Sequence, residues 1–193
     1  MSIKEFISLT KSTFKSMDTE EHIDMYFTRP IGLFFTLICK RLGIHPNAVT
    51  IFSFFLGAAA GWMFLHTDLE HNIYGVIFLL FANFCDSIDG QLARMTGKTS
   101  LVGRMLDGFA SDVWFFCVYV AICIRLFNEN IPGTEIHWGG FIWALCIAAG
   151  IMAHARQCRL SDYYRNIHLF FLLGKKGSEL DSYESQKAVA DKY

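Results

Sequence analysis

Four long apolar stretches run along the chain, and short polar stretches separate them. Each apolar stretch approaches the roughly 20 residues that an α-helix needs to cross the hydrocarbon core of a bilayer. Glycine and other small residues recur within them, as is typical of helices that pack closely in lipid. The pattern predicts four spanning helices, from about 47 to 65, 73 to 94, 113 to 127 and 138 to 153.

The segment IDMYFTRPIGLFFTLICKRLG lies before the first of these stretches. It combines an apolar face with Arg29, Lys40 and Arg41, which is typical of a helix that lies in the membrane interface. A fifth span broken by Pro30 is the alternative. The sequence thus predicts an all-α integral membrane bundle with an interfacial N-terminal helix.

Positive charge predicts the orientation of this bundle. Lysine and arginine gather before the first span, between the second and third, and after the fourth, which predicts that these regions and both termini are cytoplasmic. We expect three parts: cytoplasmic and interfacial helices over 1–45, a transmembrane domain over 46–165 that carries any chemistry, and a polar cytoplasmic tail over 166–193.

Composition supports a membrane protein, because 53% of the 193 residues are hydrophobic and 16% are aromatic. A soluble domain of this length rarely carries so much apolar side chain. The six cysteines form no C-x-x-C pair, so we expect reduced packing residues rather than zinc ligands. The net charge of −1 gives no support to nucleic-acid binding.

Four aspartates border the second and third predicted spans. Asp86 and Asp89 are three residues apart, so they share one face of a helix, and Asp107 follows at the same membrane level after a short loop. Ionised groups at such positions cost free energy unless they meet water, a partner or a metal ion. With no His or Cys beside them, these carboxylates favour Mg²⁺, Mn²⁺ or Ca²⁺ over zinc.

Such a cluster suits phosphate chemistry. Divalent ions neutralise a diphosphate, and a carboxylate outside the coordination shell can take a proton from an attacking hydroxyl. Glycines beside the acids, at positions 90, 103 and 108, would let a bulky substrate approach the backbone.

The same residues resemble the signature of the CDP-alcohol phosphotransferases, D-x-x-D-G-x-x-A-R, about eight residues, then G-x-x-x-D-x-x-x-D. The matching positions are Asp86, Asp89, Gly90, Ala93, Arg94, Gly103 and Asp107, with eight residues between Arg94 and Gly103. The resemblance implies that Asp86, Asp89 and Asp107 hold two divalent ions, Mg²⁺ or Mn²⁺, against the diphosphate of a CDP-lipid. It also implies a CDP site of Asp86, Gly90, Arg94, Gly103 and Asp107.

The last aspartate of the signature departs from the family pattern. Position 111 is serine, and Asp112 follows one residue later. On a regular helix that step turns Asp112 roughly 140° away from Asp107. A single-turn π-bulge would return it to the site. We therefore expect such a bulge, with Asp112 as general base and metal ligand and Ser111 as its neighbour.

The resemblance covers roughly residues 30 to 165, and the family generally has six spans where this chain supplies about four. We expect a truncated form, because the final segment stops inside an amphipathic pattern. Replacement of the last two helices by something unseen is the alternative. The resemblance also implies a homodimer.

After the fourth predicted span, Arg156, Arg159 and Arg165 gather on the predicted cytoplasmic side. Arginine forks bind phosphate well. In the resembled family, members that use a phosphorylated polyol, such as the phosphatidylinositol phosphate synthases, place basic residues here. These arginines are the candidate acceptor site, and anchoring to anionic lipid is the equal alternative.

The predicted function is transfer of a phosphatidyl-type group from a CDP-lipid to a small or phosphorylated alcohol, with release of CMP. Two other functions stay open. A divalent-cation channel or transporter also carries intramembrane carboxylates, although here all four acids lie near one membrane face. The other is an inactive truncated remnant kept for assembly with a partner.

Overall fold

The computed structural model of this chain describes residues 8–10, 22, 24–174 and 187, and they form helices and connecting loops with no β-strand among them. The predicted all-α fold is confirmed. The expected amphipathic C-terminal segment falls almost wholly outside the described residues. The named elements are η1 (Asp24–Thr28), α2 (Arg29–Arg41), α3 (Pro46–Phe64), α4 (Leu69–Thr96), α5 (Leu101–Leu126), α6 (Phe141–Ile147), η2 (Ala148–His154) and α7 (Ala155–Leu173).

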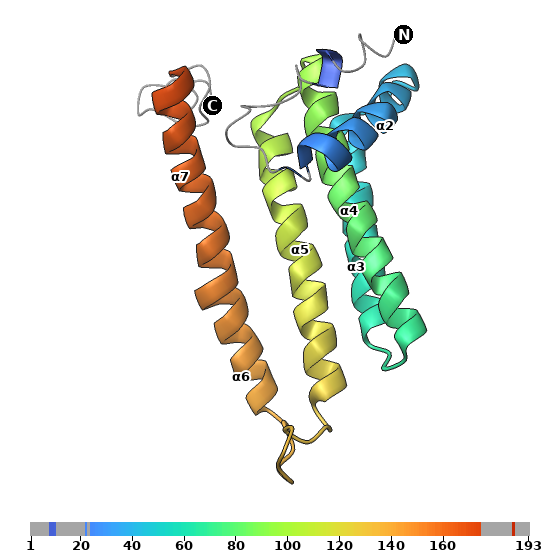
Figure 1. The fold of residues 1–193 in the computed structure, drawn as a ribbon, viewed down its shortest axis with the longest axis vertical. Helices are drawn as coiled ribbons and strands as arrows, with labels where there is room; N and C mark the ends of the chain where they lie inside the picture. The colour runs from blue at the N-terminus through green and yellow to red at the C-terminus, as the bar shows by residue number, and fades with distance from the viewer. Residues whose placement is uncertain (1–7, 11–21, 23, 175–186, 188–193) are drawn as a thin grey trace.

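Within the described residues, four helices are long and apolar enough to cross a membrane, as predicted. They are α3, α4, α5 and the continuous helix Phe141–Leu172, which joins α6, η2 and α7 (Figure 1). The fourth helix continues beyond the predicted end of the span near residue 153, through the basic segment to Leu173. Hydropathy marks the apolar layer, whereas arginine is a good helix former and lets the backbone continue beyond it.

The turn between α4 and α5 sets the two helices side by side. Gly97 ends α4 at φ +67°, a left-handed conformation that suits glycine. The Ser100 side chain then caps α5 by accepting a hydrogen bond from the Gly103 N–H at 2.9 Å. Because only residues 97–100 connect the helices, the end of α4 and the beginning of α5 lie at the same end of the bundle (Figure 1).

Helix α3 packs against both α4 and α5. Gly57 makes part of this packing possible, because a Cβ at this position would lie 2.1 Å from Cδ1 of Trp114. Small residues at such crossings let helix backbones approach closely in lipid. Two clusters of buried side chains lie within the described residues, one of Val49, Cys85, Ile88 and Leu92 and one of Ala82, Ala110 and Trp114. All six cysteines are free, as predicted.

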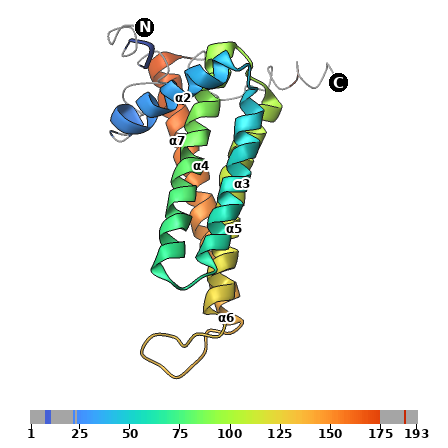
Figure 2. The same cartoon turned by 90° about the vertical axis from the view of Figure 1, so that its right-hand side faces the viewer.

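Helix α2 lies across one end of the bundle, at an angle to the spanning helices (Figures 1 and 2). Its buried Thr36 donates to the Gly32 carbonyl at 2.8 Å and lies 3.3 Å from the Ile88 carbonyl of α4. Phe34 and Phe35 are exposed on the opposite side. With 13 residues, α2 is too short to span a bilayer, so its geometry favours the predicted interfacial helix over a fifth span.

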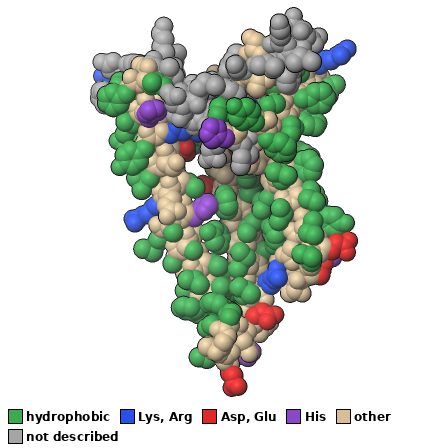
Figure 3. Space-filling view, in the orientation of Figure 1, with side chains coloured by type: hydrophobic (Ala, Val, Ile, Leu, Met, Phe, Trp, Pro, Cys, Tyr) green, Lys and Arg blue, Asp and Glu red, His purple; other side chains and the backbone are tan. Residues whose placement is uncertain are grey.

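The fourth spanning helix packs much less than the others. Only 6% of its apolar window is buried, compared with 22–33% for α3, α4 and α5. Most of its contacts with α5 come from α6 and η2, and α7 diverges from α5 towards the end where α2 lies (Figure 1). Hydrophobic side chains cover much of the outer face of the molecule (Figure 3), as expected of a surface in contact with lipid.

Candidate active site

Three of the predicted site aspartates come together between α4 and α5. Asp86 and Asp89 lie in the last turns of α4, and Asp107 lies near the start of α5. The Asp86 and Asp107 carboxyl groups are within hydrogen-bonding reach of each other, and Asp89 interacts electrostatically with both. The short turn between the helices brings them together, as the spacing in the sequence predicted.

Asp89 is the most enclosed of these acids, with 4% of its surface exposed. The hydroxyl of Thr50, on α3, donates a hydrogen bond to its Oδ2 atom. Thr50 is itself buried, and its own carbonyl accepts from Ser53 at 2.6 Å. Sequence reasoning missed Thr50, because Asp89 lies 39 positions later in the chain and local spacing does not show the contact. Its one signal is its place as a polar residue one turn after Pro46, on the buried face of an apolar helix.

The Arg94 guanidinium folds back along α4 over Gly90. A Cβ at Gly90 would lie 3.6–3.7 Å from its terminal nitrogens, and Arg94 interacts electrostatically with Asp89. Gly103 stands at a close approach of α5 to α3, since a Cβ there would lie 3.1 Å from the Asn47 side chain. The structure therefore places Gly90 and Arg94 beside the acids, and it gives Gly103 a packing role as well.

Asp112 faces a different space from the other three acids. Helix α5 is α-helical throughout Leu101–Leu126, all of which the structure describes, so the predicted π-bulge after Asp107 is wrong. The π-helical turns of the fourth span lie instead at Ala148–His154. Regular α-helical geometry turns Asp112 towards α7. There it lines a cavity of about 760 Å³ between α5 and α7.

This α5–α7 cavity has an apolar wall with a few polar side chains. Asp112, Ser111, Arg159 and Asp162 line it, together with apolar residues of both helices. Red and blue side chains are visible in the hollow between the two arms of the molecule in Figure 3. Ser111 donates its hydroxyl to the Gly108 carbonyl at 3.0 Å, so its hydrogen atom is already engaged within α5.

The three predicted acceptor arginines do not gather at one place. Arg159 lines the α5–α7 cavity with Asp112. Arg156 is exposed and is not part of the cavity wall, and Arg165 lies farther along α7, where it is half-buried. Of the three, only Arg159 lines the cavity between α7 and α5.

The ligand chemistry of these carboxylates suits a hard divalent ion. Carboxylate oxygens are the ligands that Mg²⁺ and Mn²⁺ prefer, and three neighbouring acids, one buried and two half-buried, repel one another without a cation. Among the residues that the structure describes, no group of three or more His, Cys, Asp or Glu side chains is arranged to hold an ion as it stands. Ion binding would therefore draw Asp86, Asp89 and Asp107 closer together.

Comparison with known proteins agrees with the resemblance in the sequence. The profile of the CDP-alcohol phosphatidyltransferase family matches residues 43–167. The chain is 42% identical over 66 residues to archaetidylinositol phosphate synthase of Pyrococcus horikoshii, which is 34% of each chain. It is 38% identical over 71 residues to CDP-diacylglycerol–serine O-phosphatidyltransferase of Bacillus subtilis, which is 36% of this chain and 38% of the relative.

A third relative is phosphatidylinositol phosphate synthase of Streptomyces avermitilis, 33% identical over 82 residues, or 42% of this chain and 32% of the relative. In all three comparisons the matched segment spans less than two fifths of the relative's length. These relatives differ in the alcohol that their names specify, so the comparisons leave the acceptor open.

Proposed function

Because this chain belongs to the CDP-alcohol phosphatidyltransferase family, we propose that it transfers a phosphatidyl-type group from a CDP-activated lipid to a small alcohol and releases CMP. The observation that carries the proposal is the cluster of buried Asp89 with half-buried Asp86 and Asp107, from two helices, at the positions of the family signature. Buried like charges cost free energy, so they indicate a site that a cationic ligand completes.

The reaction is an in-line displacement at phosphorus. The acceptor oxygen forms a bond to the β-phosphorus of the donor, the bond to the bridging oxygen breaks, and CMP leaves with the electron pair. Asp112 accepts the proton of the acceptor hydroxyl as general base. Asp86, Asp89 and Asp107 would hold two divalent ions, which neutralise the diphosphate and the departing CMP when bound. Gly90 and Gly103 leave room for CDP, and Arg94 supports its phosphates.

The α5–α7 cavity is the proposed acceptor site. Asp112 and Arg159 both line it, so an alcohol with an anionic group at Arg159 could present its hydroxyl to Asp112. A phosphorylated polyol fits this pairing. Arg165 farther along α7 would extend the site, whereas exposed Arg156 is placed better for contact with anionic lipid.

The proposed enzyme works at the cytoplasmic face. Lys40, Arg41, Arg94 and Arg104 all lie towards the end of the bundle that carries the carboxylates, and the opposite loops carry no lysine or arginine. By the positive-inside rule, that end faces the cytoplasm with both termini. The homodimer implied by the resemblance and the three-part division of the chain stay predictions.

The test is metal-dependent CMP release from CDP-diacylglycerol by the chain in membranes. Inositol phosphate, inositol, glycerol phosphate, serine and ethanolamine are offered separately, with Mg²⁺ or Mn²⁺, and chelated samples serve as blanks. We expect release with one acceptor only and none after chelation. If a folded chain released no CMP with any of these acceptors, the result would support the inactive remnant. Divalent-ion flux into vesicles would support a transporter.

A further inference from the structure

Residues of η1 and of the beginning of α2 lie against the turns of α4 that carry the site acids. The Phe27 ring packs on the Phe84 ring, with 5.9 Å between their centroids. Two residues further on, the Arg29 carbonyl accepts a hydrogen bond from Nε2 of Gln91 at 3.3 Å. These two contacts bracket the stretch of α4 that contains Asp86 and Asp89, so the backbone of this segment is fixed directly beside the carboxylate cluster.

Gln91 anchors this arrangement from within the interface. Its side chain is fully buried, and it also donates to the Ser87 hydroxyl at 3.1 Å. Gly32 permits the close approach, because a Cβ there would lie 2.9 Å from the Gln91 amide nitrogen. Together with the Thr36 contact one turn later, these contacts hold the start of α2 at a defined distance from α4. These contacts therefore fix the position of residue 29 relative to α4.

That position is in the neighbourhood of Asp86, with which the Arg29 guanidinium interacts electrostatically. Arg94 interacts with Asp89 at the other acid of the same helix face. Two permanent positive charges thus flank the carboxylates, one from α4 and one from a separate helix. Arg94 lies in the family signature, whereas Arg29 lies outside the matched residues 43–167.

We propose that Arg29 is a further substrate-binding residue, which contacts the diphosphate of the CDP-lipid donor. The inference rests on the proposed function. A diphosphate that approaches three carboxylates needs cationic partners besides bound ions, and the planar arginine fork matches phosphate oxygens. Helix α2 has the form of an interfacial helix, which is also the depth at which a lipid's phosphate groups lie. Arg29 therefore meets the donor where its head group enters the site.

A purely structural role makes a different prediction. If Arg29 only neutralised Asp86, its loss would lower thermal stability and turnover and leave the affinity for CDP unchanged. If Arg29 binds the diphosphate, its loss weakens CDP binding and raises the KM for the donor more than it changes kcat. Lysine at position 29 would restore part of the affinity, since it keeps the charge and loses the fork.

The experiment compares Arg29→Gln, Arg29→Lys and Lys40→Gln in the full chain in detergent with Mg²⁺. Lys40 is an exposed cation of the same helix and controls for general loss of positive charge. We measure the Kd of CDP by calorimetry, the donor KM at saturating acceptor, and the thermal unfolding midpoint. Arg29→Gln should raise Kd and KM roughly 10- to 100-fold. Arg29→Lys should lie between, and Lys40→Gln should match the wild type.

An unchanged Kd and KM in folded Arg29→Gln overturn the inference while the reaction stands. A wild-type chain that binds CDP and releases no CMP overturns the proposed reaction, and the Kd comparison still decides the role of Arg29. A wild-type chain that does not bind CDP overturns both.

Discussion

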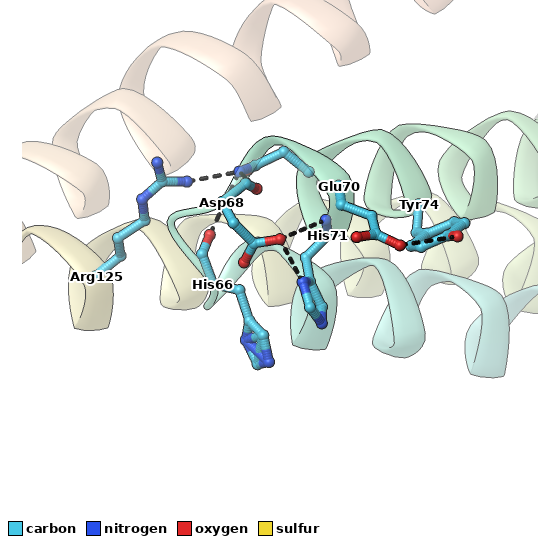
Figure 4. Close-up of polar contacts among 7 residues, drawn as sticks. His66, Asp68, Glu70, His71, Tyr74 and Arg125 are labelled. Atoms are coloured by element: carbon cyan, nitrogen blue, oxygen red, sulfur yellow. Dashed lines mark hydrogen bonds and ion pairs between the residues drawn. The ribbon is translucent and has the colours of Figure 1, made fainter.

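The two ends of the helical bundle differ in how exposed their charged side chains are and in how these side chains are paired. At the end with the 65–68 loop, polar groups are exposed and paired (Figure 4). Asp68 is 52% exposed, and its Oδ2 accepts from the His71 ring nitrogen at 2.6 Å and from the His71 backbone N–H at 3.1 Å. Nearby, Arg125 donates to the Asn72 side chain at 2.9 Å. Each contact ties one helix end to its loop or neighbour.

At the other end, a buried acid lies beside two half-buried acids. Asp89 is 4% exposed and shares its surroundings with Asp86 and Asp107, so its environment costs free energy that Thr50 offsets only in part. Asp68 stabilises its end of the fold, whereas the surroundings of Asp89 destabilise the fold. Strain of this kind is typical of sites where stability is lost in favour of activity.

The largest effect should follow Asp89→Asn. We expect CMP release to fall to the level of membranes without the chain, because the substitution removes a negative charge from the proposed ion site. Thermal unfolding without divalent ions should occur at a higher temperature than in the wild type, because a neutral amide of the same shape relieves the repulsion among the acids. Thermal scans in detergent, with and without Mg²⁺, measure this directly.

Divalent ions should raise the unfolding temperature of the wild type and leave that of Asp89→Asn almost unchanged, because ligands stabilise only a state that binds them. Asp68→Asn is the matched control from the other end and should keep CMP release. If Asp89→Asn unfolded at a lower temperature and released CMP normally, the contrast between the two ends would collapse.

The next effect separates Asp112 from Ser111. Asp112→Asn should lower kcat roughly a hundredfold or more, because the amide cannot accept the acceptor proton. Ser111→Ala should stay within a few-fold of the wild type, since its hydroxyl already bonds to the Gly108 carbonyl. Steady-state CMP release at saturating donor measures both. Equal kcat values for the two variants would remove Asp112 from the role of base.

A smaller effect should follow Thr50→Val, which keeps the shape of the side chain and removes its hydrogen-bond donor. Without the bond to Oδ2, the Asp89 carboxylate loses its fixed orientation. Residues that orient metal ligands typically change activity or metal affinity 10- to 100-fold. We expect activity to fall roughly tenfold and the Mg²⁺ concentration for half-activity to rise. Thr50→Ser should restore both, and an unchanged Mg²⁺ requirement in Thr50→Val would argue against an orienting role.

Local spacing explains which parts of the site the sequence could predict. Asp86 and Asp89 lie on one turn of one helix, and a four-residue turn brings Asp107 to their level, so their meeting followed from the pattern. Thr50 and Arg29 come from helices that are distant in the sequence, and only tertiary packing brings them to the same acids. No periodicity within a single helix contains that information.

Two features of the helices could not be predicted from the apolar pattern. Hydropathy placed the end of the fourth span near residue 153, but a helix ends where its backbone hydrogen bonds end, and those continue through α7. The π-bulge was inferred to bring Asp112 back to Asp107, yet α5 is regular and Asp112 meets Arg159 across a cavity. In both cases the regular hydrogen bonding of the backbone decided the outcome, and the apolar pattern does not report it.

The smallest expected effect is at Asp68, whose contribution to stability should depend on pH. The ring and backbone N–H groups of His71 lower the pKa of Asp68 to about 2, whereas an unfolded chain has an aspartate pKa of about 3.9. A depressed pKa in the folded state adds stability above about pH 4, and this contribution is lost as pH falls towards 2. Between pH 6 and pH 2, the thermal unfolding temperature should therefore fall more steeply for the wild type than for Asp68→Asn. His71→Ala keeps the backbone N–H and should fall between them. Parallel curves for all three proteins would show that this pair does not stabilise the loop end, and the contrast would then rest on the buried acids alone.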